Sequence, residues 1–199
     1  MSNAHSEFST PNHITVQYFE TLTRQVARTK TAPETSFRQE ALLAIITGVT
    51  VAEVFMNFYF RVIVSEPEFK HCEQRLLNDL DKRRSLERKM KQWPKEILAK
   101  ELPRSSPAIA AYVELKQIRN DLVHFTSTHT SVHVKPNLIV HGLVDTKRYA
   151  NLSVDYVEQI PSVVLGFAKE LMFLRGATTS DIGQLFHLWF GIPRLLHQT

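Results

Sequence analysis

The longest apolar segment of the chain, residues 37–64, reads FRQEALLAIITGVTVAEVFMNFYFRVIV. Its side chains are apolar on nearly every side of a helix, which is typical of a helix at the centre of its fold. Two polar residues, Glu53 and Asn57, interrupt it one turn apart. An unpaired buried carboxylate costs several kcal/mol, to order of magnitude. We therefore expect either a partly solvated face here or a cation or donor that meets Glu53.

Helical periodicity continues on both sides of this segment. Apolar residues recur at steps of three and four, and breakers such as Pro33 and Pro94 separate the runs. Four further helices are predicted, over residues 13–30, 69–92, 107–126 and 153–175, with a short apolar helix in the tail. The helix at 107–126 contains the motif RNDLVH and is called the motif helix.

Prolines, capping residues and one alternating stretch complete the prediction. Ser153 is expected to cap the helix at 153–175, Gly176 to end it, and Pro161 to kink or split it. The stretch SVHVKPNLIVHG, residues 131–142, predicts a small β-hairpin. The predicted fold is all-α, an up-and-down bundle of about five helices with this hairpin after the motif helix.

The composition is that of one helical domain. The chain has 199 residues, of which 43% are hydrophobic and 22% charged, enough to bury a core. Residues 1–12 are expected to be flexible, and residues 13–199 to form a single domain with its core in 37–175. Because Cys72 is the only cysteine, an intramolecular disulfide and a cysteine-based zinc site are both excluded.

We expect a soluble, cytoplasmic protein that does not enter a membrane. The N-terminus is polar and lacks the apolar core of a secretory signal. The longest apolar stretches are interrupted by Glu53, Asn57 and Arg61, earlier than a membrane span allows.

Positive charge is concentrated in residues 82–104, which contain nine basic and three acidic side chains. Such a local patch can hold phosphates by charge alone, although a solvated helix face has the same composition. The candidate RNA-binding residues are Lys82, Arg83, Arg84, Arg88, Lys89 and Lys91.

The motif helix contains ELKQIRNDLVHF, residues 114–125, which places three polar groups on one side. Asn120 and His124 are neighbours at i, i+4, and Arg119 lies at the edge of the apolar stripe. An arginine clamps phosphate, and a histidine exchanges protons near neutral pH. This set suits RNA cleavage by attack of the 2′-hydroxyl on the adjacent phosphate, without a metal or other cofactor. The alternative is a solvated arginine and a histidine that caps the helix C-terminus.

The string RNDLVH resembles the R-polar-xxx-H motif of HEPN domains, a helical superfamily that includes prokaryotic toxins and defence ribonucleases. TVAEVFMNF, residues 50–58, resembles the helix before the motif helix in several HEPN families. The order of the helices is also similar over residues 37–175.

The resemblance implies a homodimer with a composite active site. Arg119 would stabilise the phosphate, Asn120 would be the polar residue after it, and His124 would be the acid or base. Glu53 and Asn57 would support the site, and the burial argument makes Glu53 a candidate partner for Arg119.

Two functions of different class follow. The first is a metal-independent endoribonuclease acting in toxin or antiviral defence, with RNA, a second copy and an antitoxin or regulatory protein as expected partners. The second is a non-catalytic HEPN-like module that binds a nucleotide, RNA or a protein. A helical interaction protein without a nucleic-acid role is a further alternative. The histidines His124, His129, His133 and His141 do not have the spacing of a metal site. We expect His133 and His141 at the hairpin surface or in contact with RNA near the site.

Overall fold

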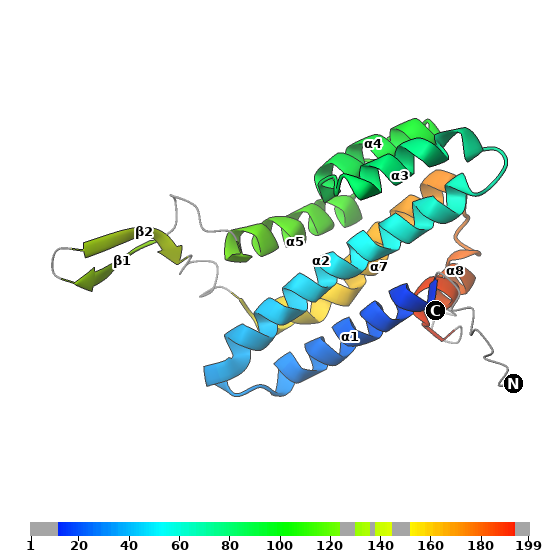
Figure 1. The fold of residues 1–199 in the computed structure, drawn as a ribbon. Coiled ribbons are helices and arrows are strands. Elements are labelled where there is room, and N and C mark those ends of the chain that lie inside the picture. The colour runs from blue at the N-terminus through cyan, green and yellow to red at the C-terminus, as the bar shows by residue number, and fades with distance from the viewer. Residues whose placement is uncertain (1–11, 124–129, 136–137, 145–151, 194–199) are drawn as a thin grey trace, which may run out of the picture.

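The computed structural model describes residues 12–123, 130–135, 138–144 and 152–193 (Figure 1). This part of the chain is a bundle of seven α-helices, which confirms the predicted helical fold. The helices are α1 (Asn12–Thr31), α2 (Glu34–Val64), α3 (Glu73–Asp81), α4 (Leu86–Leu98), α5 (Pro107–Val123), α7 (Val154–Arg175) and α8 (Ile182–Phe190). A 3-10 turn, η1 (Lys70–Cys72), precedes α3, and strands β1 (Thr130–Lys135) and β2 (Leu138–Val144) pair antiparallel.

The central helix is α2, as its composition predicts. It packs against α1, α5 and α7, and Figure 1 shows it lying between α1 and α5 with α7 behind. Its C-terminal half also contacts α3 and α4, whereas Leu43, nearer its N-terminal end, is 49% exposed. The buried side is entirely apolar apart from the Tyr59 hydroxyl and includes Ile45, Phe55 and Phe60.

Gly48 lies where α2 comes closest to its neighbours. A Cβ built at this position would lie 2.4 Å from Cγ2 of Ile160 on α7 and 3.5 Å from Cδ2 of Leu115 on α5. Carbon atoms normally approach to about 3.5–4.0 Å. The close approach of α2 to α7 therefore depends on glycine at position 48.

The charged segment forms two helices instead of the single one predicted over 69–92. The break lies between α3 and α4, where Arg83 has a φ of 48°. Ser85 then caps α4, its Oγ accepting a hydrogen bond from the Arg88 amide at 3.4 Å. Pro94 was expected in a loop, but α4 continues through it. The buried side chains of Trp93 and Ile97 extend the apolar stripe of α4 beyond Met90 and favour this continuation.

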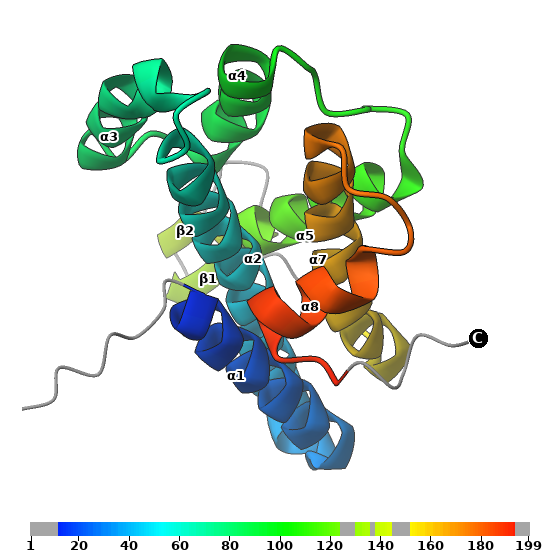
Figure 2. The same ribbon diagram turned by 90° about the vertical axis from the view of Figure 1, so that its right-hand side faces the viewer.

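The last two helices close the bundle. Ser153 caps α7 by accepting from the Tyr156 amide at 3.2 Å, and Gly176, with a φ of 108°, ends it. Pro161 lies in the first turns of α7 and does not split it. Figure 2 shows α8 crossing the bundle, where Trp189 and Phe190 contact Phe55 of α2.

One described helix, α2, is long and apolar enough to cross a membrane by length and composition alone. By length and composition, the polar residues of α2 therefore do not exclude a membrane-spanning helix, contrary to the expectation from the sequence. Half of its most apolar window is buried inside the bundle, and the core helix of a soluble protein has the same properties.

Candidate functional site

The motif helix is α5, and the structure places part of the predicted catalytic set on it. Arg119 and Asn120 lie in its last turns and are both half-buried. His124 follows the last residue given for α5, Val123, and lies outside the described residues. The arginine and the asparagine are therefore the two members of the set whose surroundings can be examined.

The guanidinium of Arg119 has unusual surroundings. Its Nε is buried and has no hydrogen-bond partner among the described residues. Tyr112 lies two turns earlier on the same side of α5, and its Oη is likewise buried without a partner there. The Tyr112 ring stacks on Phe167 with ring centroids 4.2 Å apart.

Electrostatics connect Tyr112 with Glu53 of α2 and with Arg119. Burial raises the pKa of the Tyr112 phenol well above its ordinary value, the charge of Glu53 raises it further, and the charge of Arg119 lowers it. Glu53 and Arg119 thus lie within electrostatic range of the same phenol. The hydroxyl stays protonated and uncharged near neutral pH.

The cation that meets Glu53 is Lys89 of α4. Its Nζ lies 3.2 Å from Oε1 of Glu53 and donates to Oδ1 of Asn57 at 3.0 Å. It also lies 5.4 Å from the centre of the Trp93 ring. Both alternatives expected for Glu53 hold in part, because Lys89 meets its carboxylate and its side chain is 36% exposed. The structure gives the role of the cation to Lys89, whereas the sequence suggested Arg119.

Lys89 also corrects the predicted RNA-binding set. This residue is 4% exposed and lies inside the α2–α4 contact, so it is not part of the exposed basic face. Four of the other predicted residues are exposed, namely Lys82, Arg83, Arg88 and Lys91. The basic face is therefore formed by the α3–α4 turn and the outer side of α4.

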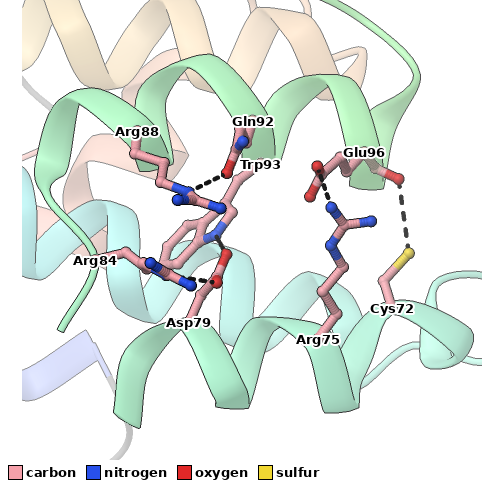
Figure 3. Close-up of polar contacts among 8 residues, drawn as sticks. All are labelled: Cys72, Arg75, Asp79, Arg84, Arg88, Gln92, Trp93 and Glu96. Atoms are coloured by element: carbon pink, nitrogen blue, oxygen red, sulfur yellow. Dashed lines mark hydrogen bonds and ion pairs between the residues drawn. The ribbon is translucent and has the colours of Figure 1, made fainter. Parts of the chain in front are cut away.

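The remaining predicted residue, Arg84, takes part in the contact between α3 and α4 (Figure 3). Its Nε lies 3.5 Å from Asp79 Oδ1, and the Trp93 indole donates to Oδ2 of the same carboxylate at 3.2 Å. Nearby, Arg75 pairs with Glu96 at 2.5 Å. Two of the basic side chains, Arg75 and Arg84, thus hold α3 to α4.

Lys116 is a residue that the sequence analysis missed. Lys116 lies four residues after Tyr112 and three residues before Arg119, so the three residues share one side of α5. The Lys116 side chain is 11% exposed. Its Nζ lies 3.4 Å from Oε2 of Glu87 in the first turn of α4. The spacing of Tyr112, Lys116 and Arg119 was the signal in the sequence, because it places all three on one side of a helix. Lys116 and Lys89 together connect the first turn of α4 to α5 and α2.

A separate groove of about 510 Å³ lies between α2, α7 and α8, and its walls include Tyr59, Arg175 and Trp189. Burial raises the pKa of the Tyr59 phenol to about 12, against the opposing charge and hydrogen bond of Arg175. Arg175 also pairs with Glu66. The groove does not include residues of α5 among its walls.

No group of three histidine, cysteine or acidic residues that could hold a metal ion occurs in the described residues. Of the four histidines considered for a metal site, His124 and His129 lie outside that part, and His133 and His141 lie in strands whose side chains are not described.

Comparisons with protein-family models, with curated proteins and with solved structures find no match to this chain.

Proposed function

We propose that this protein is a metal-independent endoribonuclease of the HEPN type. The observation that carries the proposal is the state of Arg119. It lies at the end of the motif helix without an acidic partner among the described side chains, while the nearby Glu53 is already paired with Lys89. An arginine in this state retains its charge for an anion such as phosphate.

The proposed chemistry uses the motif residues in separate roles. His124 removes the proton of an RNA 2′-hydroxyl, whose oxygen attacks the adjacent phosphorus. Arg119 binds the phosphoryl oxygens, where negative charge increases in the transition state. Asn120 orients the phosphate or the imidazole. The bond to the 5′-oxygen breaks, this oxygen takes up a proton, and a 2′,3′-cyclic phosphate and a 5′-hydroxyl remain.

The active form in this proposal is a homodimer in which both motif helices contribute to one site. The second copy would meet α2 around the half-exposed Leu43. The exposed residues Lys82, Arg83, Arg88 and Lys91 would attract the RNA backbone. The strands β1 and β2 would be a hairpin insertion after the motif helix. The biological role would be toxin activity or antiviral defence, with an antitoxin or regulatory protein as a further partner.

One observation favours a second function, a non-catalytic module that binds RNA, a nucleotide or a protein. The Nε of Arg119 and the Oη of Tyr112 are both shielded from solvent. A guanidinium held partly inside the bundle suits a fixed binding contact at least as well as catalysis.

Incubation of the purified protein with mixed RNA and EDTA distinguishes the two functions. The nuclease should release fragments that end in cyclic phosphate, and His124→Ala should abolish the cleavage without changing the circular dichroism spectrum or the oligomeric state. His13→Ala is a matched control because His13 is an exposed histidine on α1. Cleavage by His124→Ala at the wild-type rate would refute the catalytic role. RNA binding by the wild type without cleavage would support the binding module.

A further inference from the structure

Lys116 is a nearly buried cation on the side of the motif helix that carries Arg119 and Asn120. At about 100° per residue, its side chain leaves α5 in a direction between those of Arg119 and Asn120. Arg119 lies three residues later and Asn120 four, so their Cβ atoms are about 5–6 Å from that of Lys116. Lys116 thus adds a positive charge one helical turn before the two motif residues.

The partner of Lys116 is an exposed carboxylate. The Lys116 Nζ lies 3.4 Å from Oε2 of Glu87, in the first turn of α4, whereas charge-assisted hydrogen bonds of this type are about 2.7–2.9 Å long. The side chain of Lys116 is 11% exposed, and that of Glu87 is 83% exposed. Glu87 can therefore turn into solvent without a change in the backbone, while Lys116 stays in place.

A phosphate of RNA is suited to take the position of the Glu87 carboxylate. A nearly buried ammonium requires an anion or acceptors, because its charge is costly without them. A phosphate oxygen accepts a charge-assisted hydrogen bond from an ammonium as a carboxylate does. An ion pair with one exposed partner contributes little to stability, so its exchange for a phosphate is favourable where RNA is bound nearby.

We propose that Lys116 is a second phosphate-binding residue of the RNA site and that Glu87 is its exchangeable counterion. This inference rests on the proposed function, in which Arg119 binds the phosphate that is attacked. Lys116 binds a neighbouring phosphate of the same strand, which replaces the carboxylate of Glu87 on its Nζ. Glu87 lowers the affinity of the site for RNA, because the phosphate has to displace it.

The position of Glu87 also connects Lys116 with the basic face. Arg88, the next residue on α4, is exposed, and so are Lys82 and Arg83 in the turn before α4. Because Glu87 contacts Lys116, the first turn of α4 brings these exposed cations close to α5. Positive charge that attracts the RNA backbone therefore extends from the basic face to the motif helix.

Binding of a 2′-O-methyl RNA tests the proposal, because this RNA lacks the attacking hydroxyl and cannot be cleaved by the proposed route. Its affinity is measured by fluorescence anisotropy for the wild type, Lys116→Met, Glu87→Gln, the double variant Lys116→Met/Glu87→Gln and Arg119→Gln. Glu101→Gln is the matched control, since Glu101 is an exposed carboxylate in the same basic segment and pairs with Lys95 at 2.9 Å. Thermal unfolding reports whether each variant is folded.

Lys116→Met should weaken binding about tenfold or more, the scale of one charge-assisted hydrogen bond. Glu87→Gln should tighten binding by about two- to fivefold, the scale of one exposed ion pair, because the phosphate no longer displaces a carboxylate. The double variant should bind about as weakly as Lys116→Met, because Glu87 acts through Lys116. Glu101→Gln should change the affinity less than Glu87→Gln does.

The sign of the effect at Glu87 separates phosphate binding from a purely structural ion pair. If the pair only joined α4 to α5, Glu87→Gln would weaken binding or would not differ from Glu101→Gln, and either result would overturn the proposal. Wild-type affinity of a folded Lys116→Met would overturn it as well.

Two further arms keep the outcome decisive. If Lys116→Met does not fold, Lys116→Gln replaces it, because its amide keeps a donor for Glu87, and the gain of Glu87→Gln remains a separate test. Wild-type affinity of Arg119→Gln would instead refute the proposed function, whatever the result at Lys116, so the two failures are distinguishable.

Discussion

The substitution Gly48→Ala tests the packing on which the bundle depends. The new methyl group would lie 2.4 Å from Cγ2 of Ile160, about 1 Å inside ordinary contact. Ile160 is 1% exposed and branched at Cβ, so its methyl group has little freedom to move away. Either α2 or α7 must shift to accept the change.

Two opposing terms set the magnitude. Overpacking a core costs about 1–3 kcal/mol. Replacing glycine inside a helix by alanine stabilises the helix by about 1 kcal/mol. We therefore expect a net loss of up to about 2 kcal/mol in the free energy of unfolding. For a chain of this size each kcal/mol lowers Tm by roughly 2–4 °C.

Urea denaturation followed by circular dichroism measures the loss, and Gly166→Ala is the matched control. Gly166 is also inside a helix, but its nearest neighbour would be Ala108 Cβ at 3.2 Å, so a small adjustment accepts the methyl group and stability should stay near wild type. In the double variant Gly48→Ala/Ile160→Ala the methyl group enters the space that Ile160 leaves. The combined loss should be smaller than the sum by about 1 kcal/mol. Equal stability of Gly48→Ala and Gly166→Ala would refute the reasoning.

Two further predictions concern a buried phenol and a helix cap. The pKa of Tyr59 is about 12 in the fold and 10.0 ordinarily, so the folded state favours the neutral phenol. The neutral phenol therefore contributes to the free energy of unfolding below about pH 10. This contribution, up to about 3 kcal/mol, is lost as the pH rises to about 12. The Tyr59→Phe variant should therefore lose less stability than the wild type between about pH 10 and about pH 12. Urea titrations at a series of pH values measure this, and the same pH dependence of stability in both proteins would contradict it. Ser153→Ala should lower the free energy of unfolding by about 1 kcal/mol because it removes the cap of α7. Ser162→Ala, at an exposed position inside the same helix, should not lower it, and an equal loss in both variants would show that capping is not the cause.

The helices could be predicted from the sequence wherever an apolar stripe and its capping residues agreed. The central position of α2 followed from its composition, and Ser153 and Gly176 mark the ends of α7 as expected. The break between α3 and α4 was missed because Leu80 and Leu86 continue the apolar pattern across it. Ser85 inside the basic run was the signal, since a serine is a strong helix cap. Pro94 was taken as a breaker, yet burial of Trp93 and Ile97 keeps the helix intact around it.

The residue types of the candidate site could be proposed from the sequence, but their pairs could not. A polar residue inside an apolar helix requires solvent or a partner, so the sequence predicted either a partly solvated face or a cation or donor at Glu53. The sequence could not choose between cations because the choice depends on how α4 lies against α2. Helical spacing did contain a clue: Lys89 is four residues before Trp93 and one before Met90, both buried, so it lies on the inner side of α4.

The contrast between Lys89 and Lys91 shows why a count of basic residues is a poor guide to an RNA-binding surface. The two side chains are two positions apart on one helix, so they point in different directions, one into the interior and one into solvent. Under the proposed function, the exposed lysine would attract RNA through long-range attraction, which salt screens, whereas the buried lysine meets Glu53 and Asn57 inside the α2–α4 contact. Loss of Lys91 should therefore weaken RNA binding by an amount that shrinks at high salt, whereas loss of Lys89 should lower the free energy of unfolding, because it leaves Glu53 without its cation.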